Sequence, residues 1–255
     1  MRHSGGEVPR HMSPPEFSNE SRRVESRTLW LVLAVAAFGF AFFKLGSEML
    51  EGETQALDQQ VLRALRRADD PAHLVGPAWF EHAVLDLTAL GGPTVICLGV
   101  LLTLCYLLFA RRRIAAKTIF VSTAGAFALT ASLKWFFDRA RPTVVPPLST
   151  VSSGSFPSGH AALSAAVYLT MAALLAREAP NPGARRFVLA AGVLLTFLVG
   201  ATRVLMGVHY PSDVLAGWIL GSAWALLCSG AARRWRRARA ASLGGASEET
   251  ATRGG

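Results

Sequence analysis

Residues 202–213, TRVLMGVHYPSD, place three chemically active side chains where two long apolar runs of the sequence meet. A guanidinium (Arg203), an imidazole (His209) and a carboxylate (Asp213) fall within eleven residues. Charged groups are costly at such a depth in a bilayer, so a cluster of this kind indicates a functional site. The alternative is that Arg203 and Asp213 are flanking charges that reach to the membrane surface. The rest of the chain decides between the two interpretations.

The composition is typical of a membrane protein. Of the 255 residues, 51% are hydrophobic and 17% are charged. Six apolar windows have roughly the 20-residue length that spans a bilayer. They are residues 28–47, 93–110, 118–137, 159–176, 187–206 and 213–231. We therefore predict an all-α, polytopic membrane protein with six transmembrane helices.

The net charge of +9 is distributed along the chain in arginine clusters that lie beside apolar runs. These clusters are Arg22–Arg23, Arg111–Arg113, Arg185–Arg186 and Arg233–Arg239. Such juxtamembrane arginines are typical of loops that stay in the cytoplasm and meet anionic lipid. A nucleic-acid-binding protein would gather its charge on one folded face, so no nucleic-acid partner is predicted.

Polar tails enclose the predicted membrane domain. Residues 1–27 and 233–255 lack an apolar period, and we predict both to be disordered and cytoplasmic. The first apolar run follows a long polar segment and exceeds the usual length of a signal-peptide core, so we expect an uncleaved span. The membrane domain is then residues 28–232, and its three cysteines (Cys97, Cys105 and Cys228) are interpreted as small core residues.

The longest polar segment inside the domain is the acidic stretch 46–92. Within it, Leu57, Val61, Leu65 and Ala68 recur at helical spacing. This pattern predicts a short amphipathic helix. It fits a helix in the membrane interface and a helix that caps the bundle equally well.

The positive-inside rule predicts the orientation. Segments with an arginine excess alternate along the chain, and they are residues 1–27, 111–117, 177–186 and 233–239. Both termini are therefore predicted to be cytoplasmic. We expect a multi-pass protein of the cell (inner) membrane whose loops 46–92 and 138–158 face the periplasm or exterior.

Polar side chains from three segments reach this same membrane face in any six-span arrangement. The segments are the end of the third span, the start of the fourth, and the turn between the fifth and sixth. Their functional groups are Lys134, Arg139, Arg141, His160, Arg203, His209 and Asp213. Flanking charges alone do not explain two histidines at one face, so we interpret the cluster as a site.

The cations of this cluster suit a phosphate ligand. Arginines bind phosphate oxygens in pairs, and a lysine adds a point charge. The backbone amides of Ser158-Gly159-His160, at a predicted helix start, also favour phosphate. We therefore expect Lys134, Arg141 and Arg203 to form an anion pocket with these amides.

Two imidazoles and a carboxylate provide the remaining chemistry. One histidine can attack phosphorus while the other protonates the leaving oxygen, and Asp213 can hold the attacking ring in its productive tautomer. A metal site built from the same three residues is the alternative. Three nearby cations would repel a divalent ion, and the sequence offers no acidic cluster for oxygen ligation. We predict no metal and no cofactor. The absence of G-x-S-x-G and P-loop motifs weakens the case for serine hydrolase or P-loop chemistry.

Three motifs, in this order and spacing, resemble the signature of the type 2 phosphatidic acid phosphatase family. They read Lys134-x6-Arg141-Pro142, Pro157-Ser158-Gly159-His160 and Arg203-x5-His209-x3-Asp213. The superfamily also includes vanadium haloperoxidases and some soluble acid phosphatases. One residue departs from the pattern, because Thr202 stands where the family usually has serine, although the hydroxyl is kept.

The resemblance implies a role for each matched residue. His209 would be the nucleophile that forms a phosphohistidine, Asp213 its partner and His160 the general acid. The residues that would bind phosphate are Lys134, Arg141, Ser158, Gly159 and Arg203. The family's phosphatases need no metal.

These features predict an integral-membrane lipid phosphate phosphatase with its site at the non-cytoplasmic face. The expected partners are the bilayer and a lipid phosphate: phosphatidate, phosphatidylglycerophosphate or a polyprenyl diphosphate such as undecaprenyl diphosphate. A lipid phosphotransferase with the same site, or a non-enzymatic transporter of anionic lipid, are the alternatives. Six spans make a haloperoxidase less consistent with the sequence, and the oligomeric state is left open.

Overall fold

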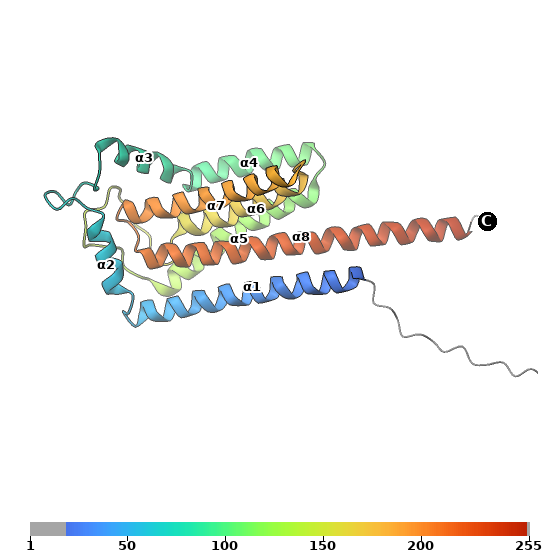
Figure 1. The fold of residues 1–255 in the computed structure, drawn as a ribbon, viewed down its shortest axis with the longest axis horizontal. Helices are drawn as coiled ribbons and strands as arrows, with labels where there is room; N and C mark the ends of the chain where they lie inside the picture. The colour runs from blue at the N-terminus through green and yellow to red at the C-terminus, as the bar shows by residue number, and fades with distance from the viewer. Residues whose placement is uncertain (1–18, 254–255) are drawn as a thin grey trace, which may run out of the picture.

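The computed structural model describes the backbone of residues 19–253, and residues 1–18 and 254–255 lie outside it. The described part is helical and contains no β-strand. Its helices, drawn in Figure 1, are α1 (Asn19–Leu50), α2 (Gln55–Ala64), α3 (Ala78–Ala89), α4 (Pro93–Phe109), α5 (Arg113–Phe137), α6 (Gly159–Glu178), α7 (Pro182–Leu205) and α8 (Pro211–Arg253).

The prediction of an all-α membrane protein is confirmed. Among the described residues, five helices are long and apolar enough to cross a bilayer, and they belong to α1, α5, α6, α7 and α8. A sixth span arises if α3 and α4, which meet at a 47° bend, count as one. The predicted span 93–110 corresponds to α4, which has only 17 residues. It is therefore short for a span unless α3 extends it.

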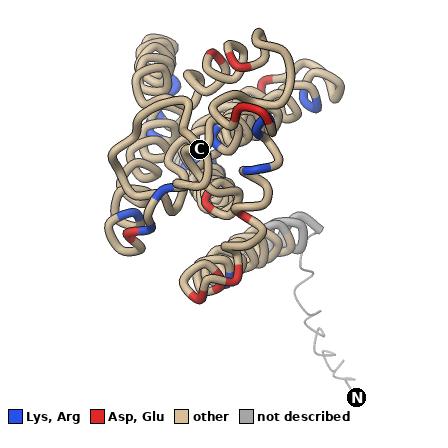
Figure 2. The backbone as a smooth tube through the Cα atoms, turned by 90° about the vertical axis from the view of Figure 1, so that its left-hand side faces the viewer, with Lys and Arg blue, Asp and Glu red and all other residues tan. Residues whose placement is uncertain are grey.

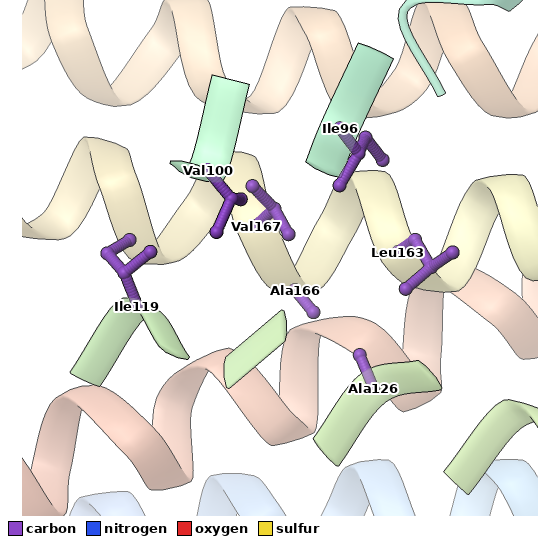
Figure 3. Packing of buried hydrophobic residues seen from close by; sticks show 7 residues of the cluster. All are labelled: Ile96, Val100, Ile119, Ala126, Leu163, Ala166 and Val167. Carbon is purple, nitrogen blue, oxygen red and sulfur yellow. The ribbon is translucent and has the colours of Figure 1, made fainter. Parts of the chain in front are cut away.

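Helix α6 lies at the centre of the bundle. Its apolar residues Leu163, Ala166 and Val167 pack against side chains of α4 and α5. Figure 3 shows this cluster, whose other members are Ile96, Val100, Ile119 and Ala126. Because α6 is packed on several sides, its first turn is held in a fixed place, and that turn carries His160.

Two glycines of α8 bring this helix into main-chain contact with α6. A Cβ atom added at Gly217 would lie 2.7 Å from the carbonyl oxygen of Ser158, and one at Gly221 would lie 2.3 Å from that of Ala162. Small residues four apart let membrane helices approach this closely. The contact sets the start of α8, with Asp213, beside the start of α6.

The acidic stretch 46–92 forms a cap over one end of the bundle. Helix α2 lies across this end (Figure 1) and buries Asp58 and Leu62 against it, whereas Leu57 is 65% exposed. The capping interpretation of the amphipathic pattern therefore fits, although the buried face differs from the predicted one. The same segment adds α3, which the sequence did not predict.

Helices extend into both predicted tails. Helix α1 begins at Asn19, inside the tail 1–27, and the earlier part of that tail lies outside the described residues. Helix α8 continues from the membrane domain to Arg253, through the segment 233–255 that was predicted to be disordered. The physical reason is propensity, because alanine and arginine, which dominate residues 231–241, are strong helix formers.

Candidate active site

All of the predicted site residues lie at the capped end of the bundle, which faces the viewer in Figure 2. Helix α5 ends there and α6 begins there, joined by the loop 138–158. Helix α7 ends there and α8 begins there, joined by a tight turn. The turn requires a left-handed residue, supplied by Gly207 at φ +71°, and a Cβ at this position would collide with Arg66 and Val145.

His209 lies in this turn and is 2% exposed. Its Nδ1 atom is 3.4 Å from Asp213 Oδ2 and 3.3 Å from the hydroxyl oxygen of Ser155. The Ser155 hydroxyl in turn donates to Asp213 Oδ2 at 2.5 Å. A carboxylate beside Nδ1 favours the tautomer with the proton on that nitrogen. The lone pair of His209 is then on Nε2.

Asp213 is fully buried, and both of its carboxylate oxygens have partners. The Oδ2 atom also accepts a hydrogen bond from the backbone amide of Tyr210 at 2.9 Å. The Oδ1 atom accepts one from Arg139 Nη1 at 2.6 Å. The carboxylate is therefore fixed in orientation, with one oxygen turned toward His209.

Arg139 connects Asp213 to a second buried carboxylate on the capping helix α2. Its Nη2 atom donates to Asp58 Oδ2 at 3.0 Å, and its guanidinium stacks on the Tyr210 ring, 4.3 Å from the ring centre. Asp58 also accepts hydrogen bonds from the amide and hydroxyl of Ser212, in the first turn of α8. A carboxylate at a helix N-terminus is stabilised by the helix dipole. The three linked side chains of Asp58, Arg139 and Asp213 thus carry a net charge of −1.

Arg141 lies on the other side of the His209 ring. Its Nη1 atom is 3.3 Å from His209 Nε2 and donates to the carbonyl of Val208 at 2.5 Å. Its Nε donates to the carbonyl of Ser153 at 2.8 Å, so both ends of the Arg141 guanidinium are held by hydrogen bonds. A cation therefore lies beside Nε2 of His209.

Two polar atoms near this pocket are buried without a hydrogen-bond partner among the described residues: Arg203 Nε and Ser158 Oγ. Arg203 is 4% exposed, and its Nη1 donates to Thr88 of α3 at 2.9 Å. Lys134, at the end of α5, donates from Nζ to the carbonyl of Gly154. Unsatisfied buried donors are costly, and a phosphate oxygen would satisfy them.

The start of α6 contributes fewer free amides than the sequence suggested. The Ser158 amide donates to the Asp213 carbonyl oxygen at 2.9 Å, so it is not available to a ligand. The amides of Gly159 and His160 are the first of the helix and lie at its positive end. The His160 side chain is half-buried and lies close enough to Arg203, Arg141 and Lys134 to feel their positive charges.

Burial controls the ionisation of the two site groups that lie in the connecting segments. Burial lowers the pKa of His209 to about 4, although the neighbouring Asp213 opposes this change. Burial also lowers the pKa of Arg141, which remains far above neutrality because arginine starts so high. At neutral pH, the site therefore pairs an uncharged imidazole with a guanidinium.

The structure brings together every residue predicted for the site: Lys134, Arg141, Ser158, Gly159, His160, Arg203, His209 and Asp213. It adds Asp58, Thr88 and Ser155, which were not assigned to the site, and it gives a contact with Asp213 to Arg139, which was placed at this membrane face without a role. Arg139 was detectable, since it lies five residues after Lys134 and two before Arg141. The other three carry no motif. In the described part of the chain, no three His, Cys, Asp or Glu side chains form a group that could hold a metal ion.

Residues 115–237 match the PAP2 superfamily. The decaprenylphosphoryl-5-phosphoribose phosphatase of Mycobacterium tuberculosis is 34% identical over 134 residues, which are 49% of this chain and 67% of the relative. The chain belongs to the PAP2 superfamily. Its candidate site contains the three motifs on which the resemblance was based. Like its phosphatase relatives, the chain is a phosphoric monoester hydrolase.

The similarity to proteins from Bacillus subtilis covers more of the chain than residues 115–237. Phosphatidylglycerophosphatase B is 29% identical over 203 residues, 78% of this chain and 96% of the relative. The crystal structure of a transmembrane PAP2-type phosphatidylglycerolphosphate phosphatase aligns with a TM-score of 0.71 at 26% identity. It covers 78% of this chain and 96% of that one. The likeness to PAP2 phosphatases therefore extends over about three quarters of this chain.

Proposed function

We propose that this protein is a membrane lipid phosphate phosphatase that works through a phosphohistidine on His209. One observation carries the proposal. A buried, uncharged imidazole has its Nδ1 beside Asp213 and its Nε2 3.3 Å from Arg141, in a pocket of cations. That arrangement suits in-line attack on an anionic phosphorus centre.

The reaction proceeds in two steps. In the first, the Nε2 lone pair of His209 forms a bond to phosphorus while the bond from phosphorus to the leaving oxygen breaks, and His160 donates a proton to that oxygen. In the second, His160 takes a proton from water. The water oxygen then bonds to phosphorus, and the bond to Nε2 breaks. Lys134, Arg141 and Arg203 neutralise the phosphoryl oxygens in both steps.

Asp213 stabilises the positive charge that the imidazole gains when Nε2 becomes phosphorylated. Arg139 holds Asp213 in place, but its positive charge cancels the negative charge of Asp213. Asp58 adds a second negative charge, so the three side chains together carry −1. Arg139 and Asp58 are therefore positioning residues that set both the direction and the strength of the field at His209.

A lipid substrate follows from the placement of the site at the end of membrane-spanning helices. An acyl or prenyl chain can stay in the bilayer while its headgroup enters the cationic pocket. The names of the relatives include a phosphatidylglycerophosphatase and an undecaprenyl-diphosphatase. We propose phosphatidate, phosphatidylglycerophosphate or undecaprenyl diphosphate as the substrate, presented at the non-cytoplasmic face.

A phosphate-release assay with detergent-solubilised protein and excess chelator tests this function. We expect hydrolysis of at least one of the three lipids, and its loss in His209→Ala by a factor of at least about 1,000. His82→Ala is the matched control, because His82 is an exposed histidine of α3. Activity that disappears on chelation, or that survives in His209→Ala, would contradict the proposed mechanism.

A further inference from the structure

An arginine-lined cavity of about 890 Å³ lies at the end of the bundle opposite to the active site. It forms where the last turn of α6, the first turn of α7 and the second half of α8 separate. Figure 1 shows α8 running on past the other helices at this end. His160 lies at the opposite end of α6, a helix length of about 30 Å away. The cavity is therefore separate from the phosphatase site.

Five guanidinium groups from three helices line the cavity. They are Arg177 of α6, Arg185 of α7, and Arg233, Arg236 and Arg237 of α8. The three on α8 follow a spacing of three and four residues, so they share one face of the helix. None of the described residues that line the cavity is an aspartate or a glutamate.

Guanidinium groups outnumber carboxylates around the cavity. Glu178 is the acidic residue beside it, and its carboxylate is 3.2 Å from Arg112, which is not part of the lining. Arg236 is repelled by Arg177 and Arg233 and attracted by Glu178. Its Nε atom is buried without a hydrogen-bond partner among the described residues. An anion in the cavity would relieve both the repulsion and the unsatisfied donor.

The N-terminus of α7 adds to this positive potential. Asn181 caps the helix by accepting a hydrogen bond from the Ala184 amide at 2.8 Å, and Pro182 follows in the first turn. A helix N-terminus carries a partial positive charge, and a cation such as Arg185 is disfavoured there. The N-terminus of α7 and the Arg185 side chain therefore both favour an anionic ligand in this part of the cavity.

The rest of the lining is apolar and belongs to membrane-spanning helices, with Leu174 from α6 and Leu189 from α7. A ligand with a phosphate head and hydrocarbon chains matches this combination, and basic pockets between helices bind such headgroups. We propose that the cavity binds the phosphate headgroup of an anionic membrane lipid, at the membrane face opposite to the active site. Arg186 and Arg234 lie on the same helices but do not line the cavity. They therefore serve as controls for lipid binding by diffuse surface charge.

Native mass spectrometry of the full chain tests the proposal. The protein is exchanged into detergent with phosphatidylglycerol or phosphatidylcholine, and vanadate occupies the active site. The variant Arg185→Gln/Arg236→Gln alters the cavity. Arg186→Gln/Arg234→Gln makes the same charge change on the same helices outside it. We expect the cavity variant to lose one bound phosphatidylglycerol, with an affinity at least about tenfold lower than that of the control.

If both variants lose bound phosphatidylglycerol equally, diffuse charge explains the binding and the proposal is wrong. If neither variant loses it, the cavity is not a lipid site and the proposal is also wrong. A second cavity variant, Arg177→Gln/Arg237→Gln, must reproduce the result, and the thermal unfolding of each protein checks that it is folded. Excess inorganic phosphate distinguishes the source of the anion. If it displaces the lipid completely, the cavity is a site for free phosphate and the lipid assignment is wrong.

Discussion

Burial gives the His209 imidazole the ionisation state that its proposed role as nucleophile requires. With a pKa of about 4, it is uncharged at neutral pH, so Nε2 keeps its lone pair without help from a base. We expect the acid limb of phosphohistidine formation, on which the rate falls because His209 is protonated, to be centred near pH 4. Acid-quenched single turnovers measure this rate. A decline already centred near pH 6.5 would show an unperturbed histidine and contradict the assignment.

The same pKa makes stability depend on pH. An unfolded histidine has a pKa of about 6.5, so the unfolded state takes up a proton first as the pH falls. The free energy of unfolding should therefore decrease between about pH 6.5 and pH 4, by about 3 kcal/mol in total from this group. Thermal unfolding in detergent measures the effect, and His209→Gln should remove this part of the pH dependence.

Substitutions of Arg139 and of Asp58 should shift the low-pH limb of the rate of phosphohistidine formation in opposite directions. Arg139→Gln leaves two carboxylates near His209, which favours the protonated ring and moves the limb to higher pH. Asp58→Asn leaves Arg139 to neutralise Asp213 and moves the limb to lower pH, each by roughly 0.5–1 unit. The double variant restores the net charge of −1 and should return the limb toward the wild-type position.

A purely structural role predicts a different outcome for these variants. Breaking a buried ion pair costs about 3–5 kcal/mol of stability, and both single variants would lose activity at every pH with no displacement of the limb. Displacement in the same direction for both would also contradict the charge argument. Asp86→Asn, which changes an exposed carboxylate of α3, is the control.

The motif residues could be predicted because their spacing is local, and each local segment ends at the same membrane face. The residues that hold them could not. Asp58 reaches Arg139 across 81 positions, and Thr88 reaches Arg203 across 115. No periodicity in the sequence connects such pairs, since only the folding of the capping segment over the bundle brings them together.

Among the elements, the pairing of α6 and α8 depends most directly on sequence. Gly221→Ala would place a methyl group 2.3 Å from the Ala162 carbonyl oxygen, on backbone that cannot yield easily. We expect a loss of about 1–3 kcal/mol in the free energy of unfolding, together with reduced activity, since the two helices carry His160 and Asp213. Thermal unfolding in detergent measures the change.

Gly39→Ala in α1 is the control for this element, because a Cβ there meets nothing within 4 Å. It should be neutral or slightly stabilising. If the two substitutions have equal effects, close approach is not what the glycine of α8 provides. Helix α3 shows the limit of sequence reasoning at this scale: Glu81, His82 and Asp86 interrupt its apolar residues, so its segment was interpreted as part of a polar loop.

For the whole molecule, the proposed orientation predicts which loops impermeant reagents can reach. With the native cysteines replaced by alanine, a single cysteine at Val151, in the loop beside the site, should be labelled by an impermeant maleimide in intact cells. A cysteine at Arg186 should be labelled only after the membrane is permeabilised. The reverse pattern would invert the orientation and place the phosphatase site in the cytoplasm.

The main-chain contact between α6 and α8 has a consequence for the evolution of substrate preference. Since the close contacts at Gly217 and Gly221 set the separation of His160 and Asp213, exposed residues such as Phe120 and Phe187 can be exchanged without moving these two groups. Variation in lipid recognition is thereby decoupled from variation in the reaction. The lipid-facing surface of such a protein can therefore change in sequence while the geometry of the site stays the same.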